Sequence, residues 1–255
     1  MNKRKEYSIA TSSLCAHVIL ACLIIMSSAA WAAPDHGLFS ELLATYNRDG
    51  HVNYAGLKTA ESRLDAYLKG LSGIDPAVLP PADRFAFYVN AYNAWTIKLI
   101  LSGYPGIESI KDLGSLFKSP WKRKFVNIHG EQVSLDHIEH DILRPQFMDP
   151  RVHFAVNCAS IGCPPLYPEA FVGSRLDQQL NTATRRFIND PRYNRLKGNT
   201  LYVSKIFKWF KEDFNQDIIA FFEQYASGEL KEEIMARKAK LKIEYLDYDW
   251  GLNGN

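Results

Sequence analysis

The segment from Asp83 to Leu101 constrains the fold more than any other part of this chain. It reads DRFAFYVNAYNAWTIKLIL, its apolar residues fall on almost every face of a helix, and Gly103 and Pro105 close it. A helix that is apolar nearly all round must be surrounded by other elements, so we expect a buried central helix here. Asn90 and Asn93 lie within it, and we expect their amides to tie neighbouring loops to the helix, because buried amides need partners.

The remaining periodic segments predict shorter helices and few strands. Helices outnumber strands and do not alternate with them regularly, which predicts an α+β fold: a single globular domain, mainly helical, with a small antiparallel sheet. Ser134 is expected to cap a helix over 135–143 that stops before Pro145, and alternating apolar residues predict a strand over 151–157. Further helices are expected over 36–46, 57–72, 174–189, 205–214 and 216–226, hairpins around Gly130 and Gly198, and a strand near 241–247.

The first 32 residues have the features of a secretory signal peptide. Three basic residues at positions 3–5 precede a long apolar run, which ends at Ala30-Trp31-Ala32, the small-x-small pattern of a cleavage site. We predict cleavage before Ala33, leaving 33–255 as the domain. The run also nearly has the length of an uncleaved membrane anchor, and Ile19-Leu20-Ala21-Cys22 loosely resembles a lipoprotein site. In each case the protein is expected to be exported, to the periplasm or beyond.

The charge balance argues against a nucleic-acid partner. The chain has 30 Lys and Arg against 28 Asp and Glu, and removal of the leader leaves 27 of each. Binding to phosphates needs clustered basic side chains, and the one such cluster, 118–124, is expected to coat a solvated turn. We expect membrane contact only through the leader, if it is not cleaved. The partner is expected to be a small molecule, a peptide or an envelope component, and no cofactor is predicted, because phosphate-loop and dinucleotide motifs are absent from the sequence.

Polar residues able to do chemistry gather between positions 136 and 163. They fall on the predicted 135–143 helix and on the segment His153-Phe-Ala-Val-Asn157-Cys158, with Cys163 close behind. We expect these two segments to form a site beneath the long helix. The candidate catalytic residues are Cys158, His140, Glu139, His153 and Asn157.

Three interpretations of this site remain open. Cys158 and Cys163 are the only cysteines after the leader, so an oxidising compartment favours a disulfide between them. Alternatively, Cys158 is a nucleophile, with His140 as its base and Glu139, Asp136 or Asn93 as the orienting group, in a thiol hydrolase or transferase. The third interpretation is a metal site in which His153 or a cysteine completes a ligand set begun by His137 and His140. None of the standard spacings of metal-binding motifs is present in the sequence.

Four separated segments of the chain stand out, namely Phe87–Ile97, Ser134–Arg144, Asp149–Pro165 and Val203–Phe214. Together they resemble the domain-of-unknown-function 547 family. The resemblance implies one globular domain with a core over about 80–214, and it directs attention to the five candidate site residues. It implies no reaction, because the family is one of exported bacterial proteins and plant proteins without an assigned activity. The order of histidine before cysteine is the reverse of that in papain-like enzymes, so analogy with them requires a permuted arrangement. A non-enzymatic envelope binding or scaffold protein with a structural disulfide therefore stays open beside the enzyme.

Overall fold

The structure is a computed structural model that describes residues 33–115 and 118–254. The predicted signal peptide over 1–32 lies outside these residues, as does its cleavage site. Within the described ranges, no helix combines the length and the apolar character that crossing a membrane requires.

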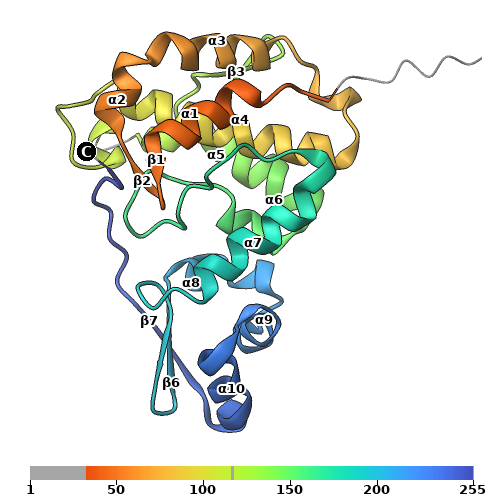
Figure 1. Ribbon diagram of the computed structural model, residues 1–255, viewed down its shortest axis with the longest axis vertical. Coiled ribbons are helices and arrows are strands. Elements are labelled where there is room, and N and C mark those ends of the chain that lie inside the picture. Colours follow the sequence, from red (N-terminus) through yellow and green to blue (C-terminus); the bar gives the residue numbers. More distant parts are fainter. Residues whose placement is uncertain (1–32, 116–117, 255) are drawn as a thin grey trace, which may run out of the picture. The chain divides into compact units, whose positions relative to one another are not determined.

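The long helix expected from the sequence is α4 (Pro81–Leu101), and it is buried along most of its length. Helices α2 (Tyr54–Thr59) and α3 (Glu61–Ser72) pack on it, and α1 (Gly37–Tyr46) packs on α3 (Figure 1). The single helix predicted over 57–72 is in fact two, because the backbone leaves the helical conformation at Ala60. Together these elements surround the first of two hydrophobic clusters.

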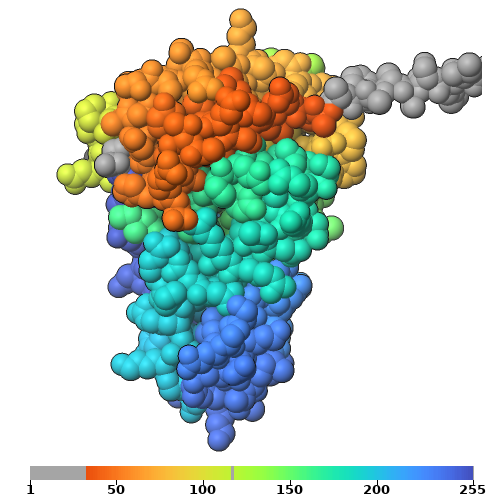
Figure 2. Space-filling view, in the orientation of Figure 1, coloured from red at the N-terminus to blue at the C-terminus, as the bar shows by residue number. Residues whose placement is uncertain are grey.

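A second hydrophobic cluster forms around phenylalanines from the later part of the chain. It is built by α7 (Leu176–Ile188), α8 (Ile206–Trp209), α9 (Ile218–Tyr225) and α10 (Gly228–Arg237), together with one strand. The sequence did not predict α10. In Figure 2 the blue residues of α9 and α10 lie away from the orange residues of α1 and α2, with the green residues of α7 between them. The phenylalanines of this cluster are Phe154, Phe187, Phe207, Phe214, Phe221 and Phe222.

The strands are short and form three small sheets in the described part of the chain. Two are antiparallel hairpins and the third is mixed, because β7 adds in parallel to the hairpin of β5 and β6. The hairpins predicted around Gly130 and Gly198 are confirmed, with positive φ angles of 83° and 60° at the two glycines. The fold is therefore α+β and mainly helical, as predicted. The strands are β1 (Asn47–Arg48), β2 (His51–Val52), β3 (Val126–Ile128), β4 (Glu131–Val133), β5 (Arg195–Lys197), β6 (Thr200–Val203) and β7 (Lys242–Tyr245).

The strand predicted over 151–157 is wrong, because Pro150–Phe154 forms a 3-10 helix. The Asp149 carboxylate accepts a hydrogen bond from the Arg151 N–H at 2.9 Å and starts this turn. The apparent alternation does not separate two faces, since Val152, His153 and Phe154 are all buried. Other 3-10 turns are Pro76–Val78, Ile110–Leu113, Pro120–Lys122, Gly173–Arg175, Lys211–Phe214 and Lys238–Lys240.

The helix predicted over 135–143 exists, but it does not stop before Pro145. Ser134 caps it as expected, its Oγ accepting from the His137 N–H at 3.0 Å. The α-helix Leu135–His137 (α5) then widens into a π-helical turn, Ile138–Leu143, and continues as α6 (Arg144–Phe147). Pro145 falls in the first turn of α6, where a missing N–H costs little.

After β7 the chain returns to the first cluster as an extended segment, residues 246–254. This C-terminal segment runs beside the loop that joins Cys158 to Cys163 (Figure 1). The N–H groups of Ile161 and Gly162 donate to the carbonyls of Gly251 and Asp249 at 2.8 and 2.9 Å, respectively. Asn253 in turn accepts a hydrogen bond from the Tyr54 hydroxyl at 2.7 Å. The segment thus ties the cysteine loop to the beginning of the described chain.

Candidate functional site

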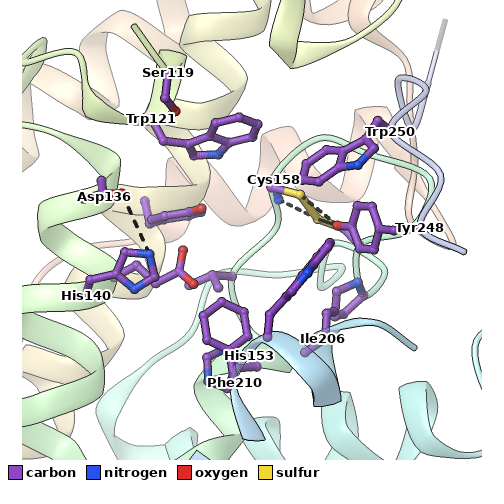
Figure 3. A pocket seen from close by; sticks show the side chains of 16 residues that line it. Ser119, Trp121, Asp136, His140, His153, Cys158, Ile206, Phe210, Tyr248 and Trp250 are labelled. Atoms are coloured by element: carbon purple, nitrogen blue, oxygen red, sulfur yellow. Dashed lines mark hydrogen bonds and ion pairs between the residues drawn. A yellow bond between two sulfur atoms is a disulfide. The ribbon is translucent and has the colours of Figure 1, made fainter. Parts of the chain in front are cut away.

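A cavity of about 240 Å³ opens where the two hydrophobic clusters meet (Figure 3). Tyr92 and Val156 in its wall belong to the first cluster, and Ile206 belongs to the second. Its remaining lining residues come from the turn at 119–121, the 136–140 helix, the 153–164 segment, the end of α8 and the C-terminal segment. They are Ser119, Trp121, Asp136, Glu139, His140, His153, Cys158, Cys163, Pro164, Trp209, Phe210, Tyr248 and Trp250.

Aromatic rings form one side of the cavity. Tyr248 and Trp250 lie with ring centroids 4.5 Å apart, and Trp209 lies 4.8 Å from Tyr248 and 5.7 Å from Trp250. Trp121 meets Trp250 edge to face at 5.9 Å. The ammonium of Lys111 lies 3.6 Å from the centre of the Trp250 ring and makes a cation–π contact with it. Lys111 itself does not line the cavity. Three tryptophans from separate segments therefore converge here.

The facing wall carries the carboxylates. Asp136, Glu139 and His140 stand at positions i, i+3 and i+4 of the helical segment, which places them on one face, and all three line the cavity. Burial, together with the nearby Glu139 charge, raises the pKa of Tyr92 well above its ordinary value. Glu139 therefore faces a tyrosine that stays protonated.

Behind this wall, Arg144, Asp213 and His153 form a polar network that also reaches His140. Arg144 donates to both carboxylate oxygens of Asp213, at 2.6 and 3.0 Å, and His153 Nε2 donates to Asp213 at 2.7 Å. Partial burial raises the pKa of Asp213, but the hydrogen bonds from His153 and Arg144 outweigh it and hold that pKa well below its ordinary range. His153 is only 3% exposed and stacks on Phe210 at 4.0 Å. It acts as a fixed donor to Asp213.

The same network sets the proton position on His140. Arg144 Nη1 donates to His140 Nδ1 at 3.1 Å, and since a guanidinium cannot accept, Nδ1 must be the unprotonated nitrogen. The neutral ring therefore carries its proton on Nε2, which lies 3.9 Å from Asp136 Oδ1 (Figure 3). In this state His140 offers a hydrogen-bond donor on the Asp136 side, and the nitrogen that could accept a proton is covered by Arg144.

Cys158 and Cys163 are joined by a disulfide in the cavity wall. The Tyr248 hydroxyl lies 3.1 Å from Cys158 Sγ and 3.2 Å from Cys163 Sγ, and the Cys158 N–H donates to Cys163 Sγ at 2.9 Å. Neither His140 nor His153 makes a hydrogen bond to either sulfur in the described residues. The structure thus brings Cys158, His140, Glu139 and His153 to one cavity, with the sulfur of Cys158 bonded.

Asn157, the fifth candidate, does not line this cavity. It is 5% exposed, and its side chain holds the cysteine loop by donating to the Pro164 carbonyl and accepting from the Ala159 N–H, both at 2.9 Å. Asn93 on α4 ties the same segment, donating to the Ala155 carbonyl and accepting from the Asn157 N–H. The loop-tying role predicted for the asparagines of α4 is confirmed, and in the structure Asn157 serves the same purpose.

The structure gives no support to the metal interpretation. His137 pairs with Asp141 at 2.8 Å and does not line the cavity that holds His140 and His153. Across residues 33–115 and 118–254, no group of three His, Cys, Asp or Glu side chains is arranged to hold a metal ion.

The sequence interpretation missed the aromatic wall. The segment 205–214 mixes aromatic and charged residues, and we assigned its aromatics to core packing; Phe207 and Phe214 are buried in this way, but Trp209 and Phe210 line the cavity. Tyr248-Asp-Trp250 gave no signal, because it lies 90 residues along the chain from Cys158. The sequence offered one hint of an aromatic site, the number of tryptophans in a chain of this length. That number does not show that the tryptophans lie together in the folded protein.

Residues 76–188 match the family model described as "Protein of unknown function, DUF547". The match begins at the turn before α4, ends with α7 and includes three of the four segments on which the resemblance depended, so it confirms that resemblance. The fourth, Val203–Phe214, lies beyond the match. No curated protein and no solved structure matches the chain.

Proposed function

The chain carries the DUF547 segment over residues 76–188, and from the site built on it we propose that this is an exported protein that binds a small organic cation in its aromatic cavity. The observation that carries the proposal is the composition of the cavity lining. Aromatic rings form one wall, and the formally charged side chains among the described lining residues are the carboxylates of Asp136 and Glu139.

The ring arrangement favours a cation over a neutral apolar ligand. A cation within about 6 Å of an indole or phenol face gains roughly 0.5–2 kcal/mol per contact, most for tryptophan. Three tryptophans and Tyr248 supply such faces, and Lys111 already lies on one of them. A quaternary or alkylated ammonium also presents carbon atoms to the rings, so it gains apolar burial together with the charge contact.

The polar wall supports the same ligand class. The carboxylates of Asp136 and Glu139 give this wall of the cavity negative charge, which attracts cations and repels phosphates or carboxylates. Asp136 and Glu139 stand on one face of one helical segment, so both carboxylates face the cavity before a ligand arrives. Pre-ordered groups bind more tightly because less freedom is lost on association.

Titration with choline tests this proposal directly. Three of the four tryptophans in residues 33–255 line the cavity, so intrinsic fluorescence reports its occupancy. We expect saturable quenching by choline, at least about tenfold tighter than by its neutral isostere with a quaternary carbon, because only the cation interacts with the rings and carboxylates. Glu139→Gln should weaken choline binding about tenfold, whereas Glu232→Gln, on the exposed face of α10, should not.

Two outcomes would contradict the proposal. Equal affinity for choline and the isostere would remove the cation from the ligand class, and absence of saturable quenching by choline would remove cation binding itself. Quenching by neutral saccharides in place of choline would reassign the aromatic wall to sugar stacking.

A thiol hydrolase or transferase is the second candidate, favoured by Cys158, His140 and Glu139 lining one cavity. It requires a free Cys158 thiolate and a base able to take its proton. Both requirements run against the contacts described above, because Cys158 is bonded to Cys163 and His140 Nδ1 accepts from Arg144. The binding function therefore has the stronger support.

Intact mass of the mature protein from its own compartment separates the two candidates. We expect a chain that starts at Ala33 and takes up two alkyl groups only after reduction, because an oxidising compartment keeps the pair bonded. Alkylation of Cys158 without reduction, with a thiol pKa well below about 8.5, would transfer the assignment to the hydrolase or transferase. A mass that retains the first 32 residues would contradict the cleaved leader.

A further inference from the structure

The disulfide of this protein lies in the wall of the cavity and not in either hydrophobic core. Its two sulfurs differ in access: Cys163 is only 4% exposed, whereas Cys158 is partly exposed. A disulfide that only staples a fold has no need to face a ligand cavity. Because this disulfide lines the cavity, a thiol that enters the cavity can reach the more exposed sulfur, that of Cys158.

The hydrogen-bond donors around the pair are also unequal. Cys163 Sγ receives the Cys158 N–H at 2.9 Å and lies 3.2 Å from the Tyr248 hydroxyl. Cys158 Sγ lies 3.1 Å from the same hydroxyl and 3.5 Å from Ser160 Oγ, and no backbone N–H of the described residues donates to it. Burial raises the pKa of Tyr248, so its hydroxyl stays protonated and able to donate. A negative charge on Cys163 would therefore find two donors already in place.

We propose that Cys158 and Cys163 form an exchangeable disulfide, in which Cys158 is attacked by an incoming thiolate and Cys163 is the leaving thiolate. A small thiol supplies the attacking sulfur. Its lone pair forms a new bond to Cys158 Sγ, the Cys158–Cys163 bond breaks, and the bonding pair passes to Cys163 Sγ. The products are a mixed disulfide on Cys158 and a Cys163 thiolate stabilised by the Cys158 N–H and the Tyr248 O–H. No other oxidant or reductant is required.

The backbone around Cys163 favours its return to the bonded state. Its N–H donates to the Ser160 carbonyl at 3.0 Å, and the two preceding residues are bonded to the C-terminal segment. Tyr248 belongs to that same segment. Opening the disulfide therefore leaves the Cys163 sulfur next to its two donors, from which it can attack the mixed disulfide and release the thiol.

Exchange with glutathione tests this inference, oxidised for the single-cysteine variants and reduced for the intact disulfide, and it does so independently of cation binding. We expect Cys163→Ser to accumulate one glutathione on Cys158 when given oxidised glutathione, and Cys158→Ser to react at Cys163 at least about tenfold more slowly because that sulfur is buried. In the otherwise unaltered protein, Tyr248→Phe should slow reduction of the disulfide by about tenfold, the effect of losing one hydrogen bond to an ionised group.

Tyr193→Phe is the matched control for Tyr248→Phe. The Tyr193 hydroxyl donates to the Ile161 carbonyl at 3.2 Å. The variant therefore removes one hydrogen bond to the same cysteine loop, and this bond does not involve a sulfur. We expect its reduction rate to stay at that of the wild type.

Three results would each overturn the inference. They are equal reduction rates for Tyr248→Phe and Tyr193→Phe, equal rates of reaction of Cys163→Ser and Cys158→Ser with oxidised glutathione, and a disulfide that is reduced only when the protein unfolds.

Discussion

Replacing Asn93 with alanine is expected to lower the free energy of unfolding by about 3 kcal/mol, because two buried backbone groups lose their partners. Asn93 Nδ2 donates to the Ala155 carbonyl at 2.9 Å, and its Oδ1 accepts from the Asn157 N–H at 2.8 Å. Ala155 and Asn157 are 2% and 5% exposed, so water cannot take over either bond. Urea unfolding of the variant and the wild type would measure the difference.

Asn90→Ala is the matched comparison on the same helix. Asn90 makes the equivalent pair of hydrogen bonds, but to the carbonyl and N–H of Phe171, away from the cysteine loop. We expect a similar loss of stability, with amide hydrogen exchange accelerated around 170–173 in this variant and around 155–159 in Asn93→Ala. A cost below about 1 kcal/mol for Asn93→Ala, or the same exchange pattern in both variants, would contradict the loop-tying role.

Asp213→Asn is expected to cost about 3 kcal/mol at pH 7, because it leaves the Arg144 guanidinium without its charged partner in a partly buried site. The side chains of Arg144 and Asp213 are 22% and 23% exposed, which places the expected cost at the lower end for a buried pair. His153, whose side chain is 1% exposed, loses its carboxylate partner as well. Thermal or urea unfolding at neutral pH would measure this cost.

The cost of Asp213→Asn should depend on pH in a definite direction. Because the hydrogen bonds from His153 and Arg144 lower the folded-state pKa of Asp213 below its ordinary 3.8, its contribution to stability is complete above 3.8 and is lost as the pH falls toward the folded-state value. The stabilities of wild type and variant should therefore converge below about pH 4. The difference in unfolding free energy between wild type and variant could instead stay constant down to pH 2.5, about one unit below the ordinary pKa of 3.8. That result would show that the carboxylate charge is not the source of the difference.

Asp247→Asn provides the control for this series. Asp247 pairs with Lys205 at 3.1 Å, but its side chain is fully exposed. Solvent screens such pairs, so we expect no measurable change in stability at any of these pH values.

The sequence predicted the fold where local pattern and tertiary environment agree. The helix over 83–101 is confirmed because a segment that is apolar all round can only be buried, and the glycine hairpins are confirmed because their turns need positive φ angles. The strand over 151–157 failed because three consecutive residues there are buried between the two clusters, so apolar alternation no longer reports a face. The helix α10 was missed because it buries one residue fully, Ile234, which leaves little periodic signal.

The candidate site was predicted only on the side where its residues are close in sequence. The cluster from 136 to 163 supplies the disulfide, Glu139 and His140, because two neighbouring segments carry them. The aromatic wall is assembled by packing between residues 119 and 250, and pairing over such separations leaves no trace in a single sequence. The hydrogen bond from Arg144 to His140 Nδ1 is likewise a property of side-chain geometry, which residue spacing cannot reveal.

The C-terminal segment has a consequence for the order in which this protein folds. Ser109 contacts Trp250 across 141 positions, and Tyr54 contacts Asn253 across 199. Contacts of such long range carry a high loop-closure cost and form late. A chain in which α4 has already packed can therefore still lack Tyr248 and Trp250 in the cavity wall. The cavity is complete, and the cysteine loop is tied, only after this segment has docked.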